Sequence, residues 1–419
     1  MRPSSVLILA MLVLSVVCSL FGWPMWPAAI LAWLATLRLF RQLPRTSRRQ
    51  AGVLFGLGVT LWVIALFRGT PYSLLHALTI NQSLLMMFAG VSFLTMATPQ
   101  AKRATSRDAQ SGSLFGTMLG AHLFGAAINL SVVFLFGERM QHAGRLTRSQ
   151  ALIVGRGFTA AAAWSPFFVA MGVALTYAPG LNYLGLLPWG LLAATLLLVL
   201  NFVDVARLKE PFVGYPIEKS ALLMPCLLAI AVVSMHLAWP DLSIPLIIAM
   251  VSPVFSFMLM PRSERRSRMR HQFTQGLQRL APQFALFLGA GVISTGLAAL
   301  LASLPDGLDL PIDHFGHWHA WLALGVIVVV SFSGIHPLIG VATLAPLIAP
   351  LNPDPTLLGI LFLMCWALGT GSSPLSGSNL AICVRYQIKV RDMLGWNLPY
   401  AIIGWFCCGL VLALHAAAT

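Results

Sequence analysis

Long apolar stretches separated by short polar segments make up almost the whole chain. Most of these stretches have at least about 17 residues, enough for a helix to cross the hydrocarbon core of a bilayer. They do not alternate apolar and polar positions as membrane β-strands do, so the pattern predicts an all-α polytopic membrane protein. The thirteen segments are 6–22, 26–40, 51–67, 73–97, 113–136, 150–177, 184–203, 221–238, 242–260, 282–304, 319–350, 356–384 and 394–416.

Composition and charge agree with this class. The chain is 58% hydrophobic and 9% charged, with a mean hydropathy of +0.84. The net charge of +14 arises from Lys and Arg in short loops between apolar segments, which indicates the positive-inside bias. We therefore expect membrane lipids as partners, and no nucleic acid. Arg2 and the apolar run after it resemble a signal peptide, but without a convincing small-x-small cleavage site we expect an uncleaved first helix.

The basic loops also predict the topology. If all thirteen segments crossed the membrane, loops 98–112 and 137–149 would lie on opposite sides. If 113–136 and 319–350 are instead re-entrant hairpins, 24 of the 26 Lys and Arg residues lie on one face, the exceptions being Arg68 and Arg156. This arrangement has about 11 transmembrane helices, two opposed hairpins and a cytoplasmic N-terminus. The alternative is that 113–136 is an ordinary helix and the count shifts elsewhere.

A repeated spacing predicts an internal duplication. Ser165-Pro166 follows Phe124 by 41 residues, and Ser373-Pro374 follows Phe332 by the same interval. Each Ser-Pro pair is followed by a helix expected to open on Leu-Pro-aromatic, at 187–189 and 398–400. We expect an extra N-terminal helix (1–25), repeat 1 (26–203, hairpin 113–136, broken helix 150–177), a cytoplasmic linker (204–220) and repeat 2 (221–416, hairpin 319–350, broken helix 356–384). Five crossings per repeat make the repeats inverted.

The segment Gly369–Asn379 is the strongest candidate site. It contains three glycines, Pro374 and six side chains with hydroxyl or amide groups, which predicts an interruption of the helix. An unwound segment exposes carbonyls that can bind Na⁺, and the following half-helix directs its positive N-terminus at an anion. The alternative is a small-residue packing face. The candidate substrate-binding residues here are Thr370, Ser372, Ser373, Ser376, Ser378 and Asn379.

Further candidates come from the hairpins and the first break. The second hairpin tip offers Ser333, Gly334 and His336, and the first repeat offers Asn129, Ser131, Arg156, Thr159 and Ser165. His336 is expected either to take a coupling proton or bind a carboxylate, or to be neutral on a backbone carbonyl. Arg156 either extends toward the cytoplasm or is a substrate counter-ion. Because no Asp or Glu is expected deep in a span, the set favours an anionic substrate.

Together these motifs resemble the ion transporter superfamily. Segment 369–379 is similar to the Gly-x-Pro-x-Gly-x-x-x-Asn break of its divalent anion/sodium symporter branch, and Ser333-Gly334-Ile335 stands where that branch has Ser-Asn-Thr. The resemblance implies an elevator-type transporter and a homodimer, with substrate between the hairpin tips and a possible Na⁺ at Gly334, Gly371 and Ser373. Neither hairpin contains Ser-Asn-Thr itself, so both Na⁺ and H⁺ stay open as coupling ions.

The sequence thus predicts an ion-coupled secondary transporter of a small anion, an organic carboxylate, in a bacterial inner membrane. No cofactor other than the coupling ion is expected. The alternatives are an exporter or channel, a non-transporting subunit, or a lipid-acting enzyme. We expect no enzyme, because the spans contain no paired carboxylates and the chain has no nucleotide-binding motif. His314, His317 and His319 form either a metal site or an interfacial loop.

Overall fold

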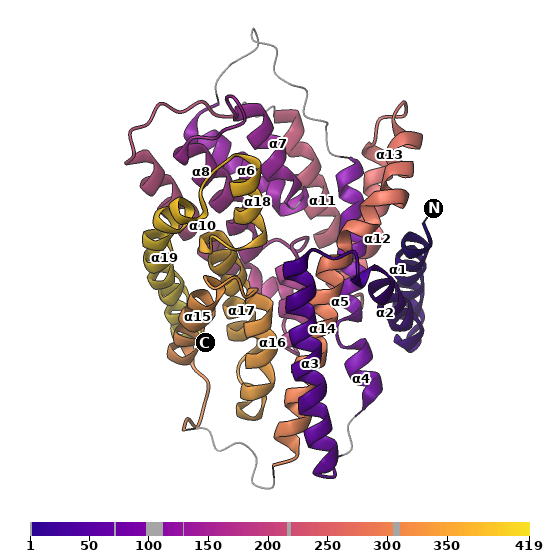
Figure 1. The fold of residues 1–419 in the computed structure, drawn as a ribbon. Coiled ribbons are helices and arrows are strands. Elements are labelled where there is room, and N and C mark those ends of the chain that lie inside the picture. Colours follow the sequence, from indigo (N-terminus) through magenta and orange to yellow (C-terminus); the bar gives the residue numbers. More distant parts are fainter. Residues whose placement is uncertain (1, 71–72, 98–111, 129, 216–218, 305–310) are drawn as a thin grey trace. The chain divides into compact units, whose positions relative to one another are not determined.

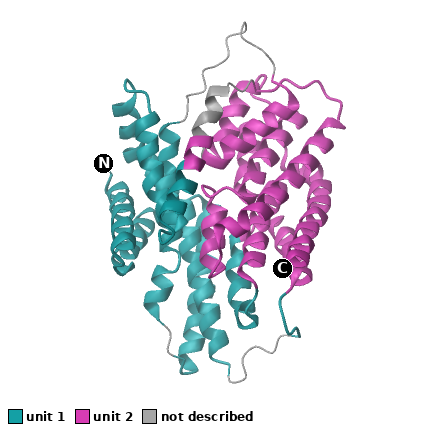
Figure 2. Cartoon of the chain, turned by 180° about the vertical axis from the view of Figure 1, so that it is seen from behind, with its two compact units in different colours: residues 1–98, 231–315, 338–353 teal, residues 99–230, 316–337, 354–419 magenta. Residues whose placement is uncertain are grey.

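The computed structural model describes residues 2–70, 73–97, 112–128, 130–215, 219–304 and 311–419, and these residues form helices and no strand (Figure 1). They belong to two compact units (Figure 2). Unit 1 comprises residues 1–98, 231–315 and 338–353, and unit 2 comprises residues 99–230, 316–337 and 354–419. Each unit therefore takes segments from both predicted repeats.

Within the described residues, seven helical segments are long and apolar enough to cross a membrane. Six shorter apolar helices accompany them. The protein is accordingly a multi-pass helical membrane protein. The predicted number of crossings stays a prediction, because length and composition alone do not place a helix across a bilayer.

Unit 1 is built around two helices that approach each other closely. α14 (Ala281–Ala302) packs along α3 (Arg45–Phe67), and Gly58 and Gly296 lie at the contact. Asn81 Nδ2, just before α5, donates to the Phe287 carbonyl of α14 at 2.6 Å and so joins the start of α5 to α14. The remaining helices of this unit are α1 (Pro3–Phe21), α2 (Trp26–Phe40), α4 (Leu74–Thr79), α5 (Gln82–Val91), α12 (Ile244–Leu259), α13 (Arg265–His271) and α16 (Pro337–Ile348).

Unit 2 is centred on α17 (Pro355–Ser372), which is buried along nearly its whole length. It is covered by helices that also position the candidate site: α8 (Arg148–Ala160), α9 (Val169–Tyr177), α10 (Tyr183–Ala206), α15 (His317–Ser331) and α19 (Val390–Ala418). The unit also contains α6 (Leu114–Ile128), α7 (Ser131–Met140) and α18 (Gly377–Arg385). α11 (Lys219–Ala238) has residues in both units.

Two sequence expectations about helix boundaries were wrong. Pro188 and Pro399 do not open their helices but lie inside α10 and α19. Proline is tolerated inside membrane helices, where neighbouring groups compensate for its missing N–H. α10 also continues to Ala206, so Asp204 belongs to this helix rather than to the linker.

Both predicted hairpin segments fold as pairs of short helices. α6 and α7 contain 15 and 10 residues and pack on each other. α15 and α16 contain 15 and 12 residues, joined by a turn in which Gly334 has a φ of 88°. A helix of 15 residues is about 22 Å long, shorter than the roughly 30 Å hydrocarbon core. Re-entry from opposite faces is consistent with these lengths and stays a prediction.

The glycine contact in unit 1 predicts a position-specific loss of stability. A Cβ at Gly58 would lie 2.6 Å from the Ile293 backbone nitrogen, whereas a Cβ at Gly56 in the same helix would meet nothing within 4 Å. We expect Gly58→Leu to lower the free energy of unfolding by about 1–3 kcal/mol, because the helices must separate. Thermal unfolding of the purified protein in detergent measures this. Gly56→Leu is the matched control, and equal losses in both variants would contradict the contact.

Candidate functional site

The second break separates α17 from α18 by four residues, and one amide satisfies its backbone. The Asn379 side chain is buried, and its Nδ2 donates to the carbonyls of Gly371 (3.0 Å) and Ser373 (2.9 Å). Ser376 caps α18 by accepting from the Asn379 backbone N–H at 3.3 Å. The last carbonyls of a helix have no partner within that helix. Asn379 therefore provides the hydrogen-bond donors that these carbonyls would have in a continuous helix.

The hydroxyl groups of this segment mostly bond the backbone. Ser373 Oγ donates to the Ser331 carbonyl at 2.6 Å, and Ser331 Oγ donates to the Gly369 carbonyl at 3.3 Å. Thr370 and Ser372 donate to carbonyls of their own helix. The two hydrogen bonds that involve Ser331 fasten the end of α15 to the break and to the end of α17. Several of the predicted ligand oxygens are thus also structural.

The tip that follows α15 lies against the same break. A Cβ at Gly334 would lie 3.4 Å from Leu375 Cβ, and one at Gly369 would lie 3.1 Å from Pro337 Cγ. His336 places its ring edge-on to Trp366, with centroids 4.6 Å apart. Exposed and half-exposed residues gather here, namely Ser333, Ile335, His336, Leu375, Ser376 and Gly377. This is the accessible part of the candidate site.

The first break, the segment between α8 and α9, is almost wholly buried. α8 passes through the 3-10 turn Ala161–Ala163 before α9 begins at Val169. Ser165 Oγ donates to the Ala126 carbonyl of α6 at 2.6 Å. His122 Nδ1 donates to the Gly157 carbonyl (3.1 Å), and His122 Nε2 accepts from Trp164 Nε1 (3.0 Å). Both ring nitrogens of this buried histidine are thereby used, as expected for a neutral imidazole.

The two breaks come together through α8. A Cβ at Gly371 would lie 2.5 Å from Thr159 Oγ1, and one at Gly155 would lie 3.4 Å from Asn379 Oδ1. α8 therefore packs against the interrupted segment between α17 and α18. The approach is closest at Gly371, where a Cβ would overlap Thr159 Oγ1, whereas a Cβ at Gly155 would be in tight contact with the ends of the Ile382 and Asn379 side chains.

Arg156, the next residue on α8, is buried with a carboxylate, an amide and an aromatic ring. Its Nη1 donates to Asp204 Oδ2 on α10 at 2.6 Å, and its Nε donates to Asn397 Oδ1 on α19 at 2.8 Å. Its Nη2 donates to the Trp396 carbonyl at 2.7 Å. The guanidinium lies 4.2 Å from the centroid of the Tyr400 ring, a cation–π distance. Arg156 thus joins three helices.

Sequence reasoning missed the partners of Arg156. The sequence placed Asp204 in the linker, gave Tyr400 only as part of the Leu-Pro-aromatic motif, and offered no role for Asn397. The signal that was present is the polar residue at 397, which stands one turn before Tyr400 in an apolar helix. The spacing of charged residues along the chain does not reveal the partners of Arg156, because they lie on helices that are distant from α8 in the sequence.

The other predicted residues lie as follows. Ser131 is the first residue of α7 and is half-buried, Ser378 is buried in α18, and Asn129 lies outside the described residues. The carbonyls of Gly371 and Ser373, predicted as possible Na⁺ ligands, accept from Asn379 in this structure. Among the described residues no group of three or more His, Cys, Asp or Glu side chains could hold a metal. His319 instead accepts from the Gly316 N–H at the start of α15.

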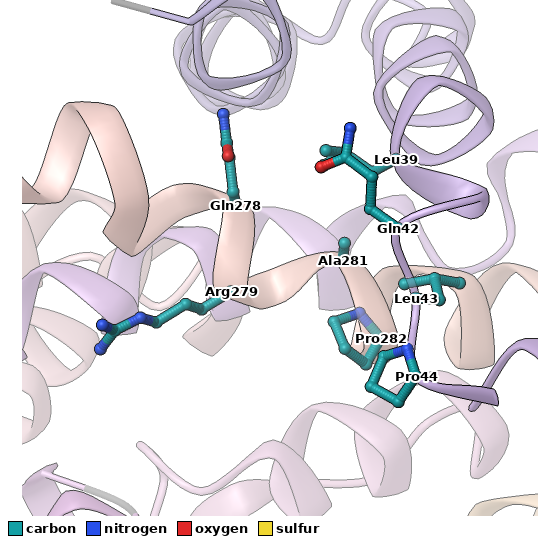
Figure 3. A pocket seen from close by; sticks show the side chains of 8 residues that line it. All are labelled: Leu39, Gln42, Leu43, Pro44, Gln278, Arg279, Ala281 and Pro282. Carbon is teal, nitrogen blue, oxygen red and sulfur yellow. The ribbon is translucent and has the colours of Figure 1, made fainter. Parts of the chain in front are cut away.

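A pocket with a volume of about 310 Å³ lies elsewhere, in unit 1. Figure 3 shows that it is lined by residues at and after the end of α2, including Leu43 and Pro44, and by residues just before and at the start of α14, including Gln278 and Pro282. None of the predicted site residues lines it. We place the candidate site at the breaks, because backbone interrupted at membrane depth is tolerated where it is buried in protein or lines a cavity.

Comparison with known proteins gave one solved structure to report. No protein-family profile and no curated protein matches the chain. The crystal structure of the Alcanivorax borkumensis YdaH transporter, described as having an unusual topology, is similar over 98% of this chain and 89% of its own. The identity is 15% and the TM-score 0.46. The function of this chain is accordingly argued from its own residues.

The contact between the breaks predicts a coupled pair of substitutions. We expect Gly371→Ala to lower the free energy of unfolding by about 1–3 kcal/mol, because the new methyl group overlaps Thr159 Oγ1. Combining it with Thr159→Ala should restore part of this loss, with a coupling energy of about 0.5–3 kcal/mol. Chemical unfolding in detergent measures both terms.

Gly377→Ala is the control for that pair, since a Cβ there meets nothing within 4 Å. We expect it to be neutral. Strict additivity of the Gly371 and Thr159 substitutions would show that α8 and the second break do not touch.

Proposed function

We propose that the protein is a secondary transporter that carries a small anion, an organic carboxylate, across the membrane. The observation that carries the proposal is the position of Arg156, a buried cation next to the residue of α8 that touches the second break. Neighbouring positions on one helix lie within its diameter of about 10–12 Å. In this proposal the charged group of a small carboxylate binds the guanidinium and its polar remainder extends toward the break.

The charge balance of unit 2 supports an anion. Ionisable residues inside a membrane protein usually mark a substrate or ion pathway. α17 carries no charged residue, and α8 supplies Arg156 where the breaks meet. The N-terminus of α18, opened by Gly377, adds a positive partial charge at the exposed part of the site.

The division of the chain supports a moving-carrier mechanism. Both breaks, α15 and the Arg156 cluster belong to unit 2, while α3, α12 and α14 belong to unit 1. An elevator mechanism requires one body that holds the substrate and another that supports it. The predicted inverted repeats and the coupling to Na⁺ or H⁺ belong to the same proposal.

Flux into proteoliposomes tests this function. We expect radiolabelled succinate, benzoate or acetate to accumulate when a Na⁺ or pH gradient is imposed, and to exchange against unlabelled anion in counterflow. A pore would equilibrate the label without counterflow, and an absence of gradient-dependent flux for the whole panel would refute the proposal.

Ser373→Ala combined with Asn379→Ala should reduce flux at least about tenfold, because the break loses its tie to α15 and the donor for its carbonyls. Initial uptake rates normalised to reconstituted protein measure the effect. Ser303→Ala, which removes a hydroxyl bonded to the Leu300 carbonyl in unit 1, is the control. Unchanged flux in the double variant would remove the second break from the site.

A further inference from the structure

The ion pair between Arg156 and Asp204 is unequal in its access to solvent. The Arg156 side chain is 1% exposed and the Asp204 side chain 31% exposed, although their charged atoms lie 2.6 Å apart. A proton from solution can therefore reach the carboxylate, whereas the guanidinium stays enclosed. Asp204 can therefore change its protonation state while Arg156 stays charged and enclosed.

Two hydrogen-bond donors beside the guanidinium are unused. Asn397 Nδ2 and Tyr400 Oη are buried and have no hydrogen-bond partner among the described residues. Asn397 is held in place because its Oδ1 accepts from Arg156 Nε, and the Tyr400 ring faces the guanidinium. Proteins seldom leave buried polar groups unsatisfied. Two donors next to a cation complement the oxygens of an anion.

We propose that Asp204 accepts the coupling proton and that a substrate carboxylate then replaces it on Arg156. The proposal rests on the function proposed above and specifies its coupling ion. Protonation converts the Asp204 carboxylate to a neutral carboxylic acid, which leaves the guanidinium without a counter-charge. A buried unpaired charge is strongly unfavourable, so an anion must take the vacated position. One proton enters for each substrate charge bound there, and no covalent bond between heavy atoms changes.

The groups around the pair fit this exchange. From α8, Arg148 adds a second positive charge near Arg156. α19 contributes two acceptors to Arg156, the Asn397 side chain and the Trp396 carbonyl, and the phenol of Tyr400. α6 presents His122, whose ring is occupied by Gly157 and Trp164. α17 carries Cys365 as its titratable side chain. Asp204 is thus the carboxylate that hydrogen-bonds Arg156 in the described part of the chain.

The first test uses the unaltered protein. Purified protein in weakly buffered detergent solution is mixed with the panel anion that shows the highest flux, and a pH-indicator dye follows proton uptake. We expect about one proton taken up per anion bound, and affinity that falls about tenfold per pH unit once Asp204 is ionised. Anion binding without proton uptake would overturn the proposal and leave the transport function standing.

The second test removes the acceptor. In Asp204→Asn we expect anion affinity to be independent of pH, and flux to be exchange only, no longer driven by a pH gradient. Asp392→Asn, the same change at an exposed carboxylate in the first turn of α19, should keep the original pH profile. A tenfold dependence retained in Asp204→Asn would refute the assignment.

If the ion pair between Arg156 and Asp204 only stabilised the fold, neither proton uptake nor the pH dependence of anion affinity would be expected. If Asp204→Asn fails to elute as a monodisperse species, Asp204→Glu replaces it and should retain proton uptake. Loss of proton uptake in a folded Asp204→Glu variant that still binds the anion would count against the proposal. Failure of every panel anion to bind or move in the unaltered protein refutes the function itself, a different result from any above.

Discussion

The backbone at an interrupted membrane helix must find hydrogen bonds inside the protein, because lipid offers none. In this chain the buried amide of Asn379 meets that requirement, by donating to the carbonyls of Gly371 and Ser373. The break can then tolerate two close neighbours, the tip after α15 and the first half of α8. This amide covers carbonyls that the interrupted helix leaves without a partner in the helix, and Ser331 Oγ adds a second donor to the Gly369 carbonyl.

The two breaks satisfy the hydrogen bonds of their interrupted backbone in different ways, and this explains why one is buried and the other partly exposed. The first tightens into a 3-10 turn and directs Ser165 to the Ala126 carbonyl, with its polar groups enclosed. The second keeps exposed residues such as Leu375 and Gly377 at its surface. The first break thus serves packing, whereas the second keeps accessible residues. The structure therefore favours an asymmetric site.

The sequence predicted where helices stop better than what their side chains contact. Glycine, proline and serine crowd into 369–379, and backbone propensity is local, so the break is readable from composition. The partners of Arg156 are set by packing of α8, α10 and α19, which no local pattern encodes. The hydroxyls of Thr370 and Ser372 were expected to face a ligand, yet they donate to carbonyls of their own helix. Ser and Thr offer both options, and only the fold selects between them.

The buried arginine constrains any mechanism more than the hydroxyls do. A hydroxyl can exchange a carbonyl for a ligand at little cost, but a guanidinium enclosed by α10 and α19 needs a negative charge in every state of the protein. Asp204 provides that charge in this structure. A substrate that reaches Arg156 must either displace the ionised carboxylate, which separates a close ion pair, or bind once the carboxylate is neutral. The second route costs less, because the proton arrives from the more exposed partner. In the mechanism proposed above, the need for charge neutrality at this one buried site links anion binding to proton uptake.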